Sequence, residues 1–217
     1  MTKRKLKQIL DQVPVDYYES GVKNNPLQRY WHTRKWQHLE EMFIDISGKS
    51  LLDIGCADGT TTKQIKKILP SAEVTGVDLY KKAINHAKKR TNKIKIKFIY
   101  GDVHNLPFGD NSFEIVTAIE TIEHLDNPNK ALAEIYRVLK PNGYLIVGQD
   151  TDSLLFRVVW FVWTKWKGGV WKNSHISCMK PEELKKALKK QGFKIEKSKI
   201  VNLGMEIFIR TRKKELL

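Results

Sequence analysis

Short apolar and β-branched runs alternate with amphipathic helical patterns through the middle of the chain. The runs predicted as strands are residues 50–54, 73–77, 95–100, 114–119 and 144–148. The helical patterns between them cover residues 60–69, 80–90 and 129–139. Because strands that alternate with helices form crossover units, this order predicts an α/β fold with a parallel sheet.

The pattern changes near the C-terminus. A helix is predicted over 181–191 and a turn at Gly192, followed by strands over 194–200 and 205–212. Only residues 201–204 link these last two strands, which is the length of a hairpin connection. The sheet is therefore expected to finish with an antiparallel strand. The Asn142-Gly143 pair predicts a turn immediately before the fifth strand.

Two regions lie outside this repeat and divide the chain into parts. Residues 1–47 read as a helical N-terminal cap, with aromatic and basic side chains at 30–36. Residues 48–217 read as the main domain, interrupted by a Trp-rich insertion at 151–176.

Composition and charge narrow the class of protein. A length of 217 residues with 41% apolar content suits one domain with a proper core. Two cysteines and an N-terminus without an apolar stretch predict a cytoplasmic protein. The net charge of +15 is compatible with nucleic acid, anionic lipid or an acidic substrate as partner. Because the lysines are scattered, we favour the simpler view that most of them solvate outward helix faces.

The segment LLDIGCADG carries the first chemical signal. A predicted strand runs into Gly55 and Gly59, and a helix follows at once, so the backbone and the helix N-terminus can approach a ligand. Asp53 and Asp58 lie in the same segment. Carboxylates would repel a dinucleotide pyrophosphate, whereas they suit a ligand with an ammonium and a sulfonium group. We therefore favour S-adenosylmethionine as the cofactor.

Two more acids follow the next two predicted strands. Asp78 lies in GVDLY, where a carboxylate can accept hydrogen bonds from both ribose hydroxyls. Asp102 lies in GDVHNLPF, where it can accept a hydrogen bond from the adenine amine. Open α/β sheets bind ligands at the carboxyl edge of their strands, and all these acids are predicted to lie there.

The succession LLDIGCADG, GVDLY, GDVHNLPFGDNSFEIV, ETIEHL and LKPNGYLIV over residues 50–148 resembles the class I S-adenosylmethionine-dependent methyltransferases of the broad type 11 group. The resemblance implies a doubly wound, Rossmann-like sheet of seven mostly parallel strands with the last one antiparallel. It implies that Asp53, Gly55 and Gly59 cradle the methionine moiety, Asp78 the ribose, and Asp102 with Val103 the adenine. Cys56, Leu79 and Glu120 are further candidate cofactor-binding residues.

Two further points follow from the resemblance. The family's N-terminal segment covers the cofactor, which makes Tyr18 and Arg34 candidates for contacts with its methionine end. Ala57 stands where the family usually has its second glycine. Because an alanine methyl group is small, we expect cofactor binding to survive with a slightly displaced backbone.

The candidate catalytic residues lie in ETIEHL. If this segment is helical, Glu120, Glu123 and His124 share one face and can, with His175, hold a divalent metal. The pattern is similar to that of ubiquinone-biosynthesis O-methyltransferases and small-RNA 3′-terminal 2′-O-methyltransferases, in which such residues are associated with a metal. We favour the alternative without a metal, in which His124 and Glu123 act as the base and as polar groups of the pocket.

The Trp-rich run at 154–171 and the overall pattern leave several functions open. Aromatic side chains interleaved with cations suit a membrane interface or a lipid-like acceptor, and they also suit stacking on single-stranded bases. The same side chains can simply pack a lid onto the domain. The favoured function is methyl transfer to a small or lipid-like acceptor, with oxygen as the favoured acceptor atom. The alternatives are a 2′-O RNA methyltransferase and a non-catalytic protein that binds S-adenosylmethionine.

Overall fold

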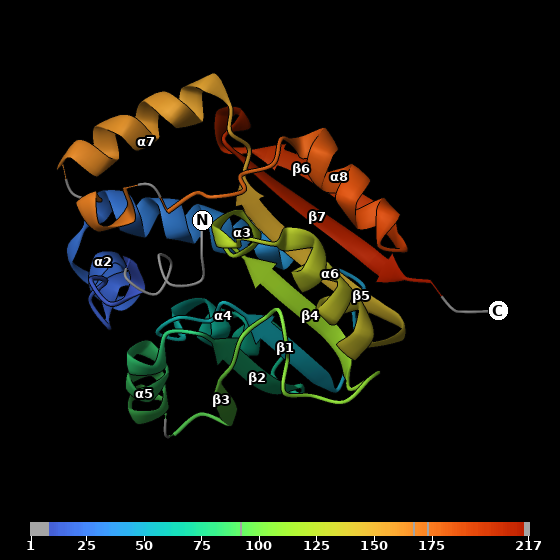
Figure 1. Ribbon diagram of the computed structural model, residues 1–217. Coiled ribbons are helices and arrows are strands. Elements are labelled where there is room, and N and C mark those ends of the chain that lie inside the picture. The colour runs from blue at the N-terminus through green and yellow to red at the C-terminus, as the bar shows by residue number, and fades with distance from the viewer. Residues whose placement is uncertain (1–8, 92, 167, 173, 215–217) are drawn as a thin grey trace.

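A computed structural model describes residues 9–91, 93–166, 168–172 and 174–214. Within them a seven-stranded sheet carries helices on both faces (Figure 1). The strands are β1 Ser50–Ile54, β2 Glu73–Asp78, β3 Ile96–Tyr100, β4 Phe113–Ile119, β5 Leu139–Asp150, β6 Phe193–Val201 and β7 Glu206–Lys213. The helices are α2 Tyr17–Asn24, α3 Pro26–Phe43, α4 Thr60–Ile68, α5 Lys81–Arg90, α6 Pro128–Val138, α7 Leu154–Trp166 and α8 Pro181–Lys190, with 3₁₀ turns η1 Ile122–His124, η2 Gly169–Trp171 and η3 Asn202–Gly204.

The strand order is β3-β2-β1-β4-β5-β7-β6. Strands β1 to β5 pair in parallel, and β7 inserts antiparallel between β5 and β6. The predicted fold class, a doubly wound sheet of seven mostly parallel strands with an antiparallel last strand, is thus confirmed. Because the parallel strands run in one direction, their carboxyl ends gather at one edge of the sheet.

The predicted turn at Asn142-Gly143 is absorbed into a strand. Strand β5 already begins at Leu139, and its pairing with β4 shifts register between Phe113 and Ile115. Asn142 adopts a left-handed φ of 59°, which asparagine tolerates better than most residues. A Cβ on Gly143 would lie 2.8 Å from the Lys140 carbonyl oxygen, so this irregularity requires glycine.

The two faces of the sheet carry separate apolar cores. On one face α6 and α8 pack through Leu132, Ile135 and Leu188. On the other face α3 contributes Leu39 and Met42, both fully buried, and α4 contributes Ile65. The C-terminal half of α3 is thus anchored in the core, which fixes where its N-terminal half lies. Among the described residues, none of the helices combines the length and the apolar character needed to cross a bilayer.

A buried carboxyl group joins three of these elements. Asp53 of β1 accepts hydrogen bonds from the hydroxyls of Thr62 in α4 (2.6 Å) and Thr117 in β4 (2.7 Å). Burial raises the pKa of Asp53 to about 6, although both threonines act in the opposite direction.

This pKa predicts a pH-dependent effect of Asp53→Asn, a substitution of nearly unchanged shape. A group whose pKa is raised on folding contributes stability below its unfolded pKa and loses it as pH rises through the folded value. Between pH 4.5 and 7.5 the wild type should therefore lose about 2 kcal/mol of unfolding free energy relative to Asp53→Asn. Urea unfolding of both ligand-free proteins at the two pH values measures the difference. A gap that stays constant with pH would show that Asp53 is ionised throughout.

Candidate active site

A cavity opens where the carboxyl ends of β1, β2, β3 and β4 meet. Its lining includes most of the residues predicted to bind the cofactor: Gly55 after β1, Asp78 and Leu79 after β2, Asp102 and Val103 after β3, Glu120 after β4, and Tyr18 from α2. We call it the cofactor cavity. The structure therefore brings together residues that are up to about a hundred positions apart in sequence.

Asp78 is held in place by the glycine-rich loop itself. One carboxyl oxygen accepts a hydrogen bond from the Tyr80 amide (2.7 Å) and the other from the Ala57 amide (2.9 Å). Burial raises the pKa of Asp78, and these backbone amides oppose the rise. Ala57 has a left-handed φ of 44°, which costs an alanine about 1 kcal/mol. Its bond to Asp78 explains how the loop keeps this conformation without the family's second glycine.

The two glycines of the loop have different roles. Gly55 has a φ of 72°, and a Cβ there would lie 2.2 Å from the Thr121 hydroxyl oxygen, so a side chain would force the loop away from β4. Gly59 has a φ of 76° and starts α4, where a Cβ would lie 2.7 Å from the Phe98 ring. Of these two glycines, only Gly55 lines the cofactor cavity. These open backbone positions and the surrounding carboxylates fit the cofactor deduced from the sequence.

The other residues of the loop lie away from this cavity. Asp58 accepts hydrogen bonds from the amides of Glu19 (2.9 Å) and Thr60 (3.0 Å), and so ties α2 to the loop. Cys56 is buried, packs with Ile84 and Phe98, and has a pKa raised by burial. Both residues and Asp53 border a smaller cavity, which shares Gly55 and Glu120 with the cofactor cavity.

The far end of the cofactor cavity contains two polar residues that sequence reasoning missed. The Asp102 carboxylate accepts a hydrogen bond from the His104 amide (3.0 Å) and lies 2.9 Å from His104 Nδ1. His104 Nε2 lies 3.3 Å from the Asp126 carboxylate. The position of His104, two residues after Asp102 in GDVHNL, was an available signal for its place beside Asp102.

A second cavity of about 220 Å³ adjoins the first, and we call it the acceptor cavity. Aromatic rings form a large part of its wall: Tyr17, Tyr18, Trp31, Phe156, Trp160, Trp163 and Trp171. Tyr18, Glu120, His124 and Trp171 line both cavities, so the two meet at these side chains. A molecule in the acceptor cavity would therefore face the cofactor.

A buried ion cluster forms the polar part of this wall. Lys35 of α3 is 2% exposed, forms an ion pair with Glu120 and lies 3.4 Å from Glu206 of β7. Burial alone would raise the pKa of Glu120, but Lys35 reverses this and lowers it to about 2. Burial raises the pKa of Glu206 to about 7 and that of Asp150 well above its ordinary value.

The structure places Arg34, the predicted site residue, and the adjacent Lys35 on different faces of α3. Arg34 lies on the exposed face of α3, where its guanidinium donates a hydrogen bond to Gln37 (3.1 Å), and it lines neither cavity. The expected contact of Arg34 with the methionine end therefore has no geometric support, whereas Lys35 points inward. Lys35 lies at helical spacing from His32, Leu39 and Met42, and that pattern was the available signal.

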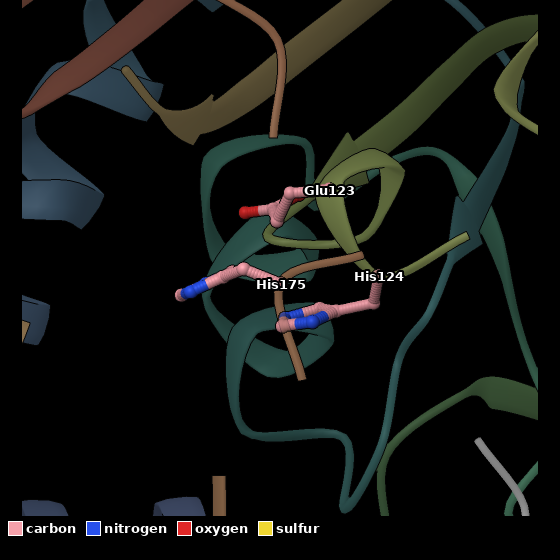
Figure 2. A group of neighbouring side chains, drawn as sticks. All are labelled: Glu123, His124 and His175. Atoms are coloured by element: carbon pink, nitrogen blue, oxygen red, sulfur yellow. The ribbon is translucent and has the colours of Figure 1, made fainter. Parts of the chain in front are cut away.

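The segment ETIEHL forms one 3₁₀ turn, η1, and not an α-helix. Glu120 precedes the turn with a φ of 50° and therefore does not share a face with Glu123 and His124. His175 from the Trp-rich insertion takes its place beside them (Figure 2), and ligand atoms of Glu123, His124 and His175 lie within 4.8 Å of one another. Of the four residues considered for a metal, these three could hold an ion.

Hydrogen bonds and stacking orient the two imidazoles. His124 Nδ1 lies 2.9 Å from the Ser174 carbonyl oxygen, and His175 Nε2 lies 3.2 Å from the Asp150 carboxyl group. Their rings stack with centroids 4.9 Å apart. Burial lowers the pKa of each histidine to about 4.

Glu123 is the least satisfied polar group in this region. It is fully buried, and neither of its carboxyl oxygens has a hydrogen-bond partner among the described residues. Burial, followed by Asp150 and Glu120, raises its pKa well above the ordinary value. An acceptor molecule with a polar group would supply the missing partner.

Comparison with known proteins supports S-adenosylmethionine as the cofactor. Residues 52–147 match the family model described as a methyltransferase domain. Phthiotriol/phenolphthiotriol dimycocerosates methyltransferase 1 of Mycobacterium ulcerans is 35% identical over 109 residues, which span 50% of this chain and 40% of that protein. Demethylmenaquinone methyltransferase of Thermotoga maritima is 25% identical, and the match spans 89% of this chain and 90% of that protein.

A solved structure has the same fold over nearly its full length. Magnesium protoporphyrin IX methyltransferase from Synechocystis PCC 6803, with bound S-adenosylhomocysteine, aligns with a TM-score of 0.76 and 15% identity. The alignment covers 98% of this chain and 100% of that one. Fold, strand-end acids and the family match over residues 52–147 agree in identifying a class I S-adenosylmethionine-dependent methyltransferase domain.

Proposed function

We propose that this protein transfers the methyl group of S-adenosylmethionine to a hydroxyl of a small, largely apolar acceptor of lipid-like or quinone-like character. The observation that carries the proposal is the acceptor cavity, whose aromatic wall joins the cofactor cavity at Tyr18 and His124. The names of two relatives, a dimycocerosates methyltransferase and a demethylmenaquinone methyltransferase, support an acceptor molecule of this lipid-like or quinone-like class.

The protein's own residues would place the two substrates. Among the residues that line the cofactor cavity, Asp78 would hold the ribose, Asp102 and Val103 would contact the adenine, and Gly55 would leave room for the methionine moiety. Once bound, S-adenosylmethionine supplies an electrophilic methyl group. The chain then has to orient the acceptor in line with that carbon and remove its proton. In this proposal α2 and α3 of the N-terminal cap, residues 1–47, help to enclose the acceptor above the domain of residues 48–217.

His124 is the group we assign to proton removal. It lines both cavities, and its Nδ1 can donate to the Ser174 carbonyl, which leaves the Nε2 lone pair to accept the acceptor's hydroxyl proton. Its lowered pKa keeps the imidazole neutral at pH 7. Glu123, with its raised pKa, would hold a proton and donate a hydrogen bond that positions the acceptor oxygen.

Charge around the cavity argues against a polyanionic substrate. Lys35 is the only lysine or arginine among the lining residues, and Glu120 already pairs with it. A 2′-O RNA methyltransferase would need basic side chains at the entrance to neutralise phosphates. RNA methylation therefore stands as the alternative that the assays below test.

Asp78→Ala should weaken the binding of S-adenosylhomocysteine by roughly thirty- to hundredfold, because two hydrogen bonds to a carboxylate are lost. Isothermal titration calorimetry of the full chain measures the affinity. Glu73→Gln, at the exposed start of the same strand, is the matched control and should bind like the wild type. Absence of binding by the wild type would refute the assigned cofactor.

His124→Asn should lower methyl transfer by about 10²- to 10⁴-fold, as expected for loss of a general base, while the affinity for S-adenosylhomocysteine changes little. The readout is tritium transfer from labelled S-adenosylmethionine into host extract separated into lipid, RNA and protein fractions. Label in the lipid fraction supports the proposal, and label in RNA favours the alternative. Transfer that resists EDTA would argue against a divalent ion at Glu123, His124 and His175.

A further inference from the structure

Helix α7 exposes an unusually apolar surface. Leu154, Leu155, Val158, Phe161 and Val162 are between 41% and 79% exposed. Their spacing of three and four residues places them along one side of the helix. We call these five residues the outer face of α7. Figure 1 shows α7 at the periphery of the molecule, beyond the carboxyl ends of the central strands.

The opposite side of the same helix forms part of the site. Phe156, Trp160 and Trp163 line the acceptor cavity, and Phe156 stacks on Trp160 with centroids 5.7 Å apart. Val159, at the boundary of the two sides, lines the cavity and is also 41% exposed. One helix therefore separates the acceptor cavity from the surroundings, and it is apolar toward both.

The charge of this helix and of the whole chain is positive, which favours an anionic partner. Helix α7 contains Arg157 and Lys165 and no acidic residue, and the whole chain has a net charge of +15. Arg157 is paired with Asp152, whereas the Lys165 ammonium lies 5.6 Å from the centroid of the Phe161 ring. A cation beside an exposed aromatic ring matches the boundary between headgroups and acyl chains.

We propose that the outer face of α7 docks onto an anionic lipid bilayer. Its 13 residues span about 20 Å, less than the hydrocarbon core of a membrane, so the helix lies in the plane of the interface. The inference deepens the proposed function and rests on it in one respect: an apolar acceptor would pass from the bilayer past α7 into the cavity that this helix walls.

Vesicle flotation of the full-length protein tests the docking. The vesicles contain either phosphatidylcholine alone or an equal mixture of phosphatidylcholine and phosphatidylglycerol. We expect the wild type to float with the anionic vesicles and to partition at least about tenfold less onto the neutral ones, with added salt weakening the interaction. The double variant Phe161→Glu/Val162→Glu should lose at least about tenfold of the anionic partitioning, because two apolar side chains become charged.

Ile44→Glu is the matched control. Ile44 is 54% exposed, follows α3 near the start of β1, and so lies at the edge of the sheet opposite the site. Its flotation should equal that of the wild type. Calorimetry with S-adenosylhomocysteine on all three proteins should give equal affinities, which separates a failure of docking from a failure of the fold or of the proposed function.

Two results would overturn the inference. One is a wild type that stays at the bottom of the gradient with both vesicle types while it still binds S-adenosylhomocysteine. The other is equal flotation of the wild type and the double variant, which would assign membrane binding to another surface. If analytical ultracentrifugation instead shows a dimer that Phe161→Glu/Val162→Glu dissociates, and the protein does not float, the outer face is an interface between two copies.

Discussion

The arrangement of the site depends on one buried cation, the ammonium group of Lys35. Removing a lysine from water is costly unless it is paired, and here Glu120 at the end of β4 and Glu206 at the start of β7 provide the pairing. The cluster thereby holds α3 across the carboxyl edge of the sheet. Because Glu120 lines both cavities, its position also decides where the cofactor cavity ends and the acceptor cavity begins.

The same cluster sets the electrostatic character of the acceptor side. Three carboxyl groups, those of Glu120, Asp150 and Glu206, share one ammonium. Glu120 is ionised, with a pKa of about 2. Burial raises the pKa of Asp150 well above its ordinary value and that of Glu206 to about 7, so Asp150 holds a proton and Glu206 is close to half ionised at neutral pH. A single carboxylate thus faces the point where the cavities meet. That arrangement suits a sulfonium on one side and an uncharged, apolar molecule on the other.

The sequence predicted the features that depend on local pattern. Alternating strands and helices, and acids such as Asp78 and Asp102 at strand ends, follow from hydrophobic periodicity and from the geometry of parallel sheets. The prediction named Arg34 in place of Lys35, because neighbouring helix positions point about 100° apart and only the helical spacing of Lys35 with His32, Leu39 and Met42 distinguishes the two. The sequence also did not predict the positive φ of Glu120, which separates this residue from Glu123 and His124.

The Trp-rich insertion shows why pattern alone was ambiguous there. A helix that is apolar all round is usually buried in a core or in a membrane, and the residues of α7 cannot indicate which. In the fold, one side of α7 packs against the domain and the other side is exposed. Phe156 and Trp160 close the acceptor cavity and stack near His175, while Val158 and Phe161 remain exposed. His175 contacts both Trp160 of α7 and Asp150, so a displacement of this helix would also move the imidazole of His175 at the polar end of the cavity. The surface that meets the surroundings is thus one helix diameter away from the groups assigned to the chemistry.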